Sequence, residues 1–261
     1  MKTNTKLIKQ TLLCCLCILL IATFVIMLKY SSMTTNDTKN IDSIKNECIV
    51  HSEENKEDSK DISVDWEKLN GMNKDITGWL YLRGSVINYP VVQSIDNDYY
   101  LNHDYRGNKS TSGSIFEDYR VDENSNNRVI YGHNLKNGTG FGELINYYKN
   151  TKQADKHKII KYYSKGETHT YALVGAFYAN SSKFEFNRTD LSEEYFEKYI
   201  DRVNKEFIYS TGITANDTDK LLTLCTCSYN FKGERFVVIF RELREQEGES
   251  ESTLRFDFKE G

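Results

Sequence analysis

Two runs of strand-forming residues near the carboxyl end of the chain constrain its fold most strongly. The first covers residues 221–227 and the second covers residues 235–240, and both are rich in Leu, Thr, Val, Ile and Phe, which suit a pleated, half-buried surface. The polar segment 228–234 between them is short enough to join antiparallel neighbours. We therefore expect Cys227, at the end of the first strand, to lie beside Arg235, at the start of the second. A thiol next to a permanent cation is the outline of a nucleophilic site, because the thiolate is the reactive form and positive charge favours it.

Further short strands and a few helices are predicted before this hairpin. Helices are expected at 66–72, at 141–148 and most clearly at 191–208, where apolar residues form one stripe and Asp190 can cap the first turn. The chain has many short strands and no repeated strand–helix–strand (βαβ) units. This pattern predicts a mainly β protein, a closed or nearly closed mixed barrel with helices attached. The expected strands, between turn residues, are 79–82, 86–92, 114–116, 128–131, 158–163 and 168–178.

The amino-terminal segment has the pattern of a single membrane-spanning helix. Three lysines precede residues 11–28, which carry no charge, and Lys29 follows them; the length reaches the threshold of about 18 residues for a span. A cleaved signal peptide is the alternative, but the run exceeds an h-region of ~7–15 residues and no small-x-small cleavage site follows it. The charges on either side orient the amino terminus inside. We expect a cytoplasmic segment 1–10, an anchor 11–28 and the bulk of the chain outside the cell.

Three segments are expected after the anchor. Residues 29–62 are polar and charged without apolar periodicity, which is typical of a flexible stalk. Residues 63–244 are expected to form the folded domain, and residues 245–261 a charged tail. Because the stalk is expected to bury nothing, removal of everything before Asp61 is expected to leave a folded, active domain.

The net charge and the positions of the cysteines limit the classes of function that this chain can have. The net charge of −4 is too mild and too negative to indicate a nucleic-acid-binding protein. Of the six cysteines, three lie in the expected span and Cys48 in the expected stalk. Cys225 and Cys227 are two apart on one strand, which is too close for an ordinary disulfide. An extracytoplasmic chain with unpaired thiols either tolerates them or uses one.

A histidine at another strand end is the second candidate catalytic group. The strand 128–131 ends at Tyr131, and Gly132 permits a sharp turn that presents His133. A lone histidine is more often structural, but here Cys227 and Arg235 occupy comparable strand ends. These three residues could supply a nucleophile, a proton carrier and an oxyanion stabiliser, the parts that acyl transfer needs.

The motifs resemble those of the sortases, the membrane-anchored cysteine transpeptidases of Gram-positive bacteria. Residues 223–227 match the sortase signature TLxTC, Arg235 before a Val-Val strand matches the sortase arginine, and residues 131–134 resemble the sortase histidine segment. The helix 191–208 and the segment 97–101 are similar to those of class B. The resemblance implies an eight-stranded sortase β barrel, a covalent thioacyl intermediate and no cofactor or metal.

The resemblance also implies a role for each candidate residue. Cys227 would attack the carbonyl of a Thr in the carboxy-terminal sorting pentapeptide of a secreted protein, and Arg235 would stabilise the oxyanion. His133 would protonate the departing amine and then accept a proton from the incoming amine of a cell-wall precursor or a pilin Lys. Ser228 stands where some class B members carry an acidic residue. The groove for the sorting signal would be lined by Asn97, Leu101, Tyr131, Cys225 and Thr226.

Two other functions fit the same residues. A cysteine peptidase would let water attack the same intermediate, and the sequence does not separate it from a transpeptidase. A zinc-binding surface module would use Cys225, Cys227 and His133, although two ligands two apart on a strand give poor tetrahedral geometry.

Overall fold

A computed structural model describes residues 2–51, 62–180, 185–227, 233–247 and 254–260 of the chain. Two compact units are present, Met1–Asn40 and Ile41–Gly261. Helix α1 spans Lys2–Cys48. Its residues up to Asn40 make up the first unit, and its residues from Ile41 belong to the second.

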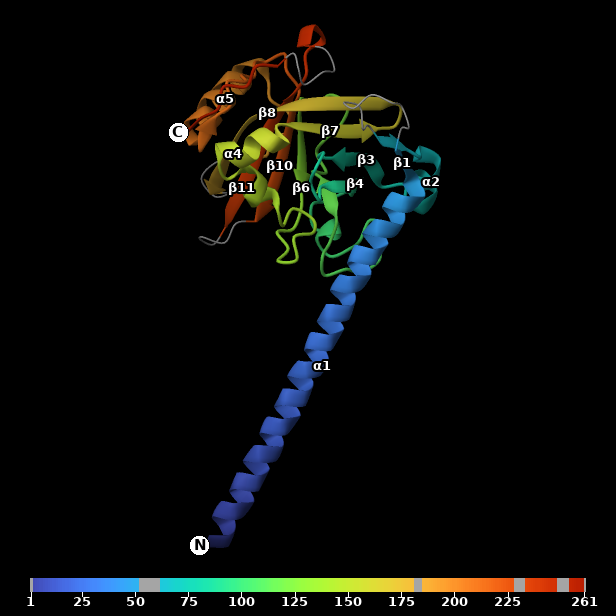
Figure 1. Cartoon of the computed structure of the whole chain (residues 1–261), viewed down its shortest axis with the longest axis vertical. Coiled ribbons are helices and arrows are strands. Elements are labelled where there is room, and N and C mark those ends of the chain that lie inside the picture. Colours follow the sequence, from blue (N-terminus) through green and yellow to red (C-terminus); the bar gives the residue numbers. More distant parts are fainter. Residues whose placement is uncertain (1, 52–61, 181–184, 228–232, 248–253, 261) are drawn as a thin grey trace. The chain divides into compact units, whose positions relative to one another are not determined.

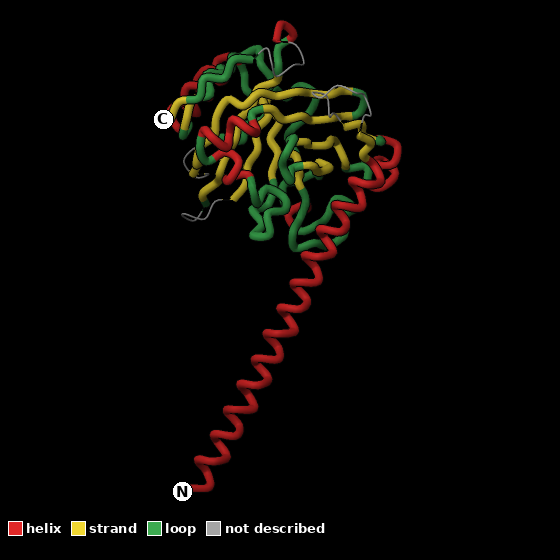
Figure 2. The backbone as a smooth tube through the Cα atoms, viewed as in Figure 1, coloured by secondary structure: helices red, strands yellow, loops and turns green. Residues whose placement is uncertain are grey.

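A closed β barrel forms the centre of the second unit (Figures 1 and 2). Its strands follow the order β10-β11-β8-β7-β3-β4-β5-β6, and closure leaves the barrel without a free edge. The pairs β4–β5 and β6–β10 are parallel, and the remaining pairs are antiparallel. The predicted eight-stranded, mainly β barrel is therefore confirmed. The strands are β3 (Ile76–Tyr81), β4 (Asn88–Gln93), β5 (Ile115–Glu117), β6 (Asn127–Tyr131), β7 (Ile159–Ser164), β8 (Glu167–Asn180), β10 (Leu221–Cys227) and β11 (Glu234–Glu242).

Smaller elements surround the barrel. Two short antiparallel pairs flank it, β1 (Ile49–His51) with β2 (Ile62–Val64), and β9 (Tyr209–Ser210) with β12 (Lys259–Glu260). The helices are α2 (Trp66–Met72), η1 (Tyr99–Leu101), α3 (Leu144–Tyr148), α4 (Thr151–Ala154), η2 (Asp155–His157), α5 (Glu193–Glu206) and η3 (Glu245–Glu247).

Strand β10 contributes to two different apolar clusters. Leu222 and Leu224 join the cluster that fills the barrel interior. Leu221 and Cys225 point to the other face, because strand side chains alternate, and they join the cluster that contains Phe196 of α5. The strand that carries Cys227 is thus buried on both faces along most of its length.

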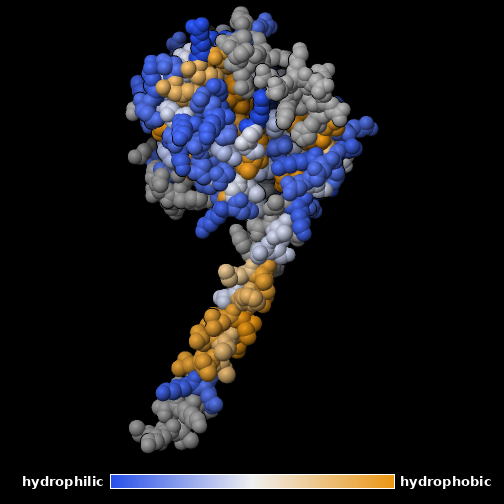
Figure 3. All heavy atoms as spheres, in the orientation of Figure 1, coloured by the Kyte–Doolittle hydropathy of each residue, from blue (hydrophilic) through white to orange (hydrophobic). Residues whose placement is uncertain are grey.

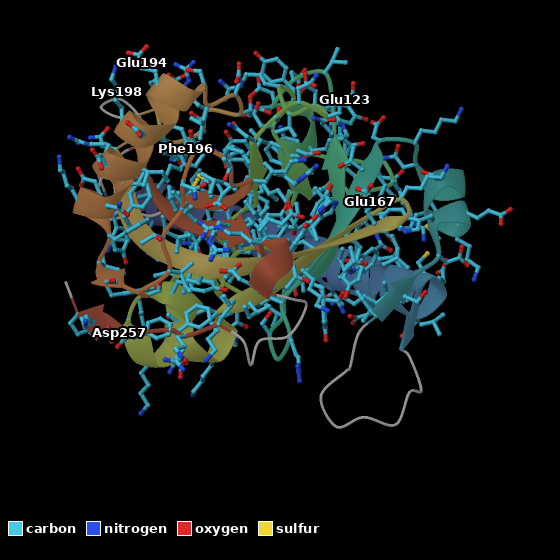
Figure 4. All side chains as sticks on the ribbon, turned by 90° about the horizontal axis from the view of Figure 1, so that it is seen from above. Glu123, Glu167, Glu194, Phe196, Lys198 and Asp257 are labelled. Carbon is cyan, nitrogen blue, oxygen red and sulfur yellow. The ribbon has the colours of Figure 1, made fainter. Side chains whose placement is uncertain are left out.

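The long helix predicted before this strand is α5, which covers the outer face of the barrel. Figure 4 shows Phe196 directed toward the sheet, with Glu194 and Lys198 on the far side of the helix, where their side chains form an ion pair (Oε1–Nζ 2.6 Å). The predicted cap at Asp190 is wrong, since the helix starts after Ser192. The preceding chain is instead held by Asn126, whose side chain hydrogen-bonds both the backbone N–H and the carbonyl of Leu191 (2.8 and 2.6 Å).

The predicted flexible stalk, 29–62, differs from the structure over residues 29–51, because residues 29–48 are helical and residues 49–51 form a strand. Here α1 continues to Cys48, and β1 pairs with β2. Ile44 and Cys48 are fully buried in a cluster with Trp79. Together with Ile41 they form an apolar stripe at i, i+3 and i+7 on one face of the helix. The polar residues between them make this periodicity hard to detect in the sequence. The folded unit therefore begins near Ile41; residues 52–61 of the expected stalk lie outside the described residues.

This packing changes the expected result of truncation. A chain that begins at Ile41 should keep the stability of the parent domain, whereas a chain that begins at Ile62 should lose about 2–5 kcal/mol of unfolding free energy, the usual effect of deleting a buried aliphatic side chain. Urea unfolding of the two truncated proteins measures this difference. Equal midpoints would mean that Ile44 and Cys48 contribute nothing to the domain.

The predicted charged tail also packs on the domain. Phe256 and Phe258 contact the interior cluster, and β12 pairs with β9. Glu247 of η3 forms an ion pair with the buried Arg241 (2.5 Å). Leu254, Phe256 and Phe258 alternate with charged residues, the pattern of a half-buried extended segment, so the tail is part of the fold where the structure describes it.

Helix α1 contains one stretch, Lys9–Leu28, that is long and apolar enough to cross a membrane by length and composition. None of this stretch is buried, so it is not the core helix of a globular domain. Figure 3 shows apolar side chains gathered along it. The stretch begins two residues before the predicted span 11–28 and ends at the same residue.

Candidate active site

The β10–β11 hairpin brings a thiol and a guanidinium together. Cys227 and Arg235 are register partners in this antiparallel pair, and Cys225 lies opposite Val237. The expectation that Cys227 and Arg235 lie side by side is confirmed. The residues 228–232 of the connection, including Ser228, lie outside the described residues.

His133 reaches the same level through the parallel pairing of β6 with β10. Tyr131 lies opposite Cys225 in this pair. Two residues further along are His133, just past the end of β6, and Cys227, at the end of β10. The candidate residues His133, Cys227 and Arg235 therefore lie at the ends of three neighbouring segments, and we call these three positions the catalytic row.

Hydrogen bonds extend the β6–β10 contact beyond the last paired residue. The N–H of Gly132 donates to the Cys225 carbonyl (3.2 Å), and the Thr226 hydroxyl donates to the Gly132 carbonyl (2.8 Å). The side-chain amide of Asn134, which follows His133, donates to the carbonyl of Cys227 (2.9 Å). Side chains thus replace the missing ladder bonds, so that the histidine segment and the end of the cysteine strand are held together.

The His133 ring is oriented by the backbone of η1. Its Nε2 lies 2.8 Å from the carbonyl oxygen of Leu101. A carbonyl only accepts, so Nε2 carries a proton and Nδ1 is the atom that can exchange one. Gly113 packs closely here: a Cβ on it would lie 3.0 Å from His133 Cδ2 and 2.7 Å from the Leu101 oxygen. Leu101 therefore holds the histidine through its main-chain carbonyl, and its role as a groove residue stays a prediction.

The two cysteines of β10 have different environments. Cys225 is 1% exposed, and burial raises the pKa of its thiol well above the usual range, even though the charge of Arg235 lowers it. A buried protonated thiol is unreactive. Cys227 at the strand end is partly exposed, so it is the accessible thiol of the pair.

Cys225 and Thr226, which were predicted to line a groove, are both buried, and the hydroxyl of Thr226 donates to the Gly132 carbonyl. Their strand has a paired neighbour on each side. Their contact with a peptide stays a prediction.

The guanidinium of Arg235 keeps its charge available. Its Nη1 donates to the carbonyl of Glu234 (3.0 Å), which orients the group. Within the part of the chain that the structure describes, no carboxylate forms an ion pair with it. A planar donor with no carboxylate partner among the described residues, next to a thiol, suits the stabilisation of an oxyanion.

The other predicted groove residues, Asn97 and Tyr131, meet at a carboxylate that the sequence did not indicate. The amide of Asn97 and the hydroxyl of Tyr131 both donate to Oδ2 of Asp118, at 3.0 and 2.9 Å. Asp118 follows β5, and the antiparallel pairing of β5 with the next strand, β6, brings it beside that strand, where its N–H donates to the Val129 carbonyl (2.9 Å). The sequence analysis did not single it out.

The zinc alternative lacks a set of ligands. Among the described residues, no three His, Cys, Asp or Glu side chains converge in a way that could hold a metal ion. His133 and the two cysteines of β10 belong to these residues.

Asn134 should affect turnover through the position of Cys227. Replacement by alanine removes the bond to the Cys227 carbonyl, which is worth about 0.5–1.5 kcal/mol, and should lower kcat/KM by up to roughly tenfold. Asn137→Ala, an exposed change in the same loop, serves as control. Steady-state kinetics with a cleavable peptide measure the effect; equal losses in both variants would mean that the loop as a whole, rather than this bond, is responsible.

Comparison with known proteins places these features in a family. The model of the sortase domain matches residues 83–242. Sortase B of Listeria monocytogenes is 36% identical over 169 residues, which cover 61% of this chain and 65%, just under two thirds, of that protein. The X-ray structure of sortase B from Clostridium perfringens is 35% identical with a TM-score of 0.65, over 69% of this chain and all of that one. A Staphylococcus aureus sortase B–substrate complex is 30% identical with a TM-score of 0.64, over 69% of this chain and 84% of that one.

Proposed function

Because this chain belongs to the sortase family, and within it to class B, we propose that it is a cysteine transpeptidase that joins secreted proteins to an amine of the cell wall. The observation that supports the proposal is that Cys227 and Arg235 are register partners and that the strand paired with the cysteine strand ends two residues before His133. The S. aureus relative has been solved as a substrate complex, which supports a sorting-signal peptide as the substrate.

The first half of the reaction forms a thioacyl enzyme. The Cys227 sulfur, as thiolate, attacks the carbonyl carbon of the Thr in the sorting signal, and the carbonyl oxygen takes the negative charge. Arg235 donates hydrogen bonds to this oxyanion. As the C–N bond breaks, His133 gives the proton on Nδ1 to the departing amine. The Thr acyl group is then bonded to Cys227, and the released carboxy-terminal fragment carries a free amine.

The second half transfers the acyl group. An amine of a cell-wall precursor, or a pilin Lys, attacks the thioester while His133 Nδ1 accepts its proton. The oxyanion again lies against Arg235, and collapse of the intermediate returns the thiolate of Cys227. The residues of this chain supply every proton and charge that these steps need, so no cofactor is required.

The apolar stretch of α1 supports a location at the cell membrane. We place the amino terminus inside and the catalytic domain outside, because lysines precede the stretch and acidic residues follow it. The domain assigned from sequence to residues 63–244 is extended by the packing of residues 41–51 and of the described part of the tail. Such an anchor would keep the enzyme where secreted proteins emerge.

A product assay distinguishes transfer to an amine from hydrolysis of the same thioacyl intermediate. The protein is incubated with a library of pentapeptides that contain Thr, with and without added triglycine, and the products are identified by mass spectrometry. We expect a Thr–amine conjugate in the presence of triglycine and slower release of the free acid without it. Free acid alone, at a rate that triglycine does not change, would indicate a cysteine peptidase.

A further inference from the structure

We propose that Asp118 is a positioning residue for the peptide substrate, because its carboxylate holds Tyr131 and Asn97 in place beside the catalytic row. The inference rests on the proposed function and assigns a residue to it that does not take part in the chemistry. The group formed by Asp118, Arg120, Asn97, Tyr131 and Asn187 is called the Asp118 cluster below.

Both oxygens of the Asp118 carboxylate are fully used. The side chain has no exposed surface. Its Oδ1 accepts from the backbone N–H of Arg120 (3.0 Å) and from Arg120 Nε (2.9 Å). Its Oδ2 accepts from Arg120 Nη2 (2.9 Å), the Tyr131 hydroxyl (2.9 Å) and the Asn97 amide (3.0 Å). This is a complete set of partners for a buried carboxylate.

Asp118 is ionised in the folded protein. Burial by itself would raise the pKa of this carboxyl, but the hydrogen bonds from Arg120 and Tyr131 and the charge of Arg120 outweigh burial and hold the pKa below its usual value. An ionised carboxylate only accepts hydrogen bonds, so each of its donors is held in one direction. The phenol proton of Tyr131 must therefore point at Asp118.

The cluster joins three segments that lie far apart in the sequence. Asn97 precedes η1, Asp118 and Arg120 follow β5, and Asn187 precedes α5. The Asn187 amide donates to the Tyr131 hydroxyl (2.9 Å), and Arg120 Nη2 donates to the Asn187 carbonyl (2.8 Å). Tyr131 is thus fixed by a donor on one side and an acceptor on the other.

The position of Tyr131 makes this cluster relevant to the substrate. Tyr131 lies level with Cys225, two residues before the catalytic row, which corresponds to roughly 6.6 Å along a strand. Tyr131 and Asn97 are both partly exposed. A peptide that places its scissile carbonyl at Cys227 would extend over such a surface within one or two residues. Free movement of Tyr131 and Asn97 would weaken peptide binding while leaving the catalytic row intact.

The variant Asp118→Asn tests the proposal. The amide keeps the size of the side chain but turns an N–H₂ toward donors that the carboxylate accepts from, so several hydrogen bonds to a charged group are lost. We expect KM for the best-cleaved pentapeptide of the library to rise by roughly ten- to a hundredfold and kcat to stay within about threefold. Alkylation of Cys227 by iodoacetamide should proceed at the parent rate, because none of the hydrogen bonds described for the cluster involves Cys227.

Two further variants separate positioning from folding. Asp122→Asn is the matched control, since Asp122 is an exposed aspartate of the same loop that bonds only its own turn among the described residues, and it should behave as the parent. Tyr131→Phe removes one donor with little change in shape and should raise KM by a smaller factor. If Asp118 acts through Tyr131, the double variant should raise KM by less than the product of the two single effects.

The outcomes distinguish this inference from the proposed function. An active parent with an unchanged KM in Asp118→Asn would overturn the inference alone. A folded Asp118→Asn that loses kcat and alkylation rate together with affinity would also overturn it, because the role would then be general support of the site. A parent that neither binds nor cleaves any peptide of the library would overturn both.

Discussion

Replacement of Cys227 by alanine is expected to abolish peptide cleavage and formation of the thioacyl enzyme. Loss of a covalent nucleophile lowers turnover on the order of 10⁴-fold or more, because no neighbouring group can take its place. Cys225, two residues away on the same face, cannot do so: it is buried and its pKa is raised by that burial. Mass spectrometry of the protein after incubation with the peptide should show an acyl adduct in the parent and none in the variant.

Cys225→Ala is the matched control for this result. It removes a thiol from the same strand but leaves the catalytic row complete, so it should retain the adduct and most of the turnover. It should also lower the unfolding free energy by about 1 kcal/mol, since the sulfur packs in the cluster under α5. An adduct that survives in Cys227→Ala and disappears in Cys225→Ala would mean that the nucleophile has been assigned to the wrong cysteine.

Arg235→Lys is expected to lower turnover almost as much as Arg235→Ala, by about 10²–10³-fold. The oxyanion needs donors at fixed positions; a guanidinium is a rigid planar fork, whereas an ammonium on a flexible stem is a point charge. Arg235 is oriented by its strand partner Cys227 and by its bond to the Glu234 carbonyl. The oxyanion exists only beyond the ground state, so peptide affinity should change little.

Steady-state kinetics of the lysine variant measure this effect. Arg188→Lys provides a control, because Arg188 is a partly exposed arginine that stacks on Tyr195 of α5 (4.2 Å), and the structure gives it no contact with the catalytic row. Turnover of Arg235→Lys within about threefold of the parent would show that Arg235 provides charge alone, and its assignment as a hydrogen-bond donor to the oxyanion would be wrong.

The pattern of the sequence near the catalytic residues is sufficient to predict much of the fold. The hairpin of β10 and β11 is closed by a short connection, so strand propensity and loop length together place Cys227 beside Arg235. The stripe of α5 and the many short strands are likewise local patterns, and they predicted a barrel with a long helix before the cysteine strand. His133 was identified as a candidate only from its position at a strand end and from the presence of Cys227 and Arg235 at comparable strand ends.

The errors of the sequence reading have a common cause. Ile44 and Cys48 were assigned to a stalk, and Phe256 and Phe258 to a tail, because a few apolar residues among many charges give a weak local signal. Their burial depends on surfaces of the folded domain that are supplied by distant residues. Cys225 was expected to line the groove from the family resemblance, and the structure shows it buried in the cluster that contains residues of α5.

Local patterns in the sequence thus determined which residues could perform acyl transfer and which strands carry them. The tertiary structure alone decided which of them meet and what holds them there. Strands β6 and β10 are parallel neighbours whose paired residues, such as Tyr131 and Cys225, are far apart in the sequence, and parallel pairing needs a long connection that no short pattern specifies. The antiparallel pairing of β5 with β6 brings the carboxylate of Asp118 to Tyr131, and the segment before η1 adds Asn97. A buried charge is stable only where the fold assembles its hydrogen-bond donors, and no single segment supplies all of those of Asp118.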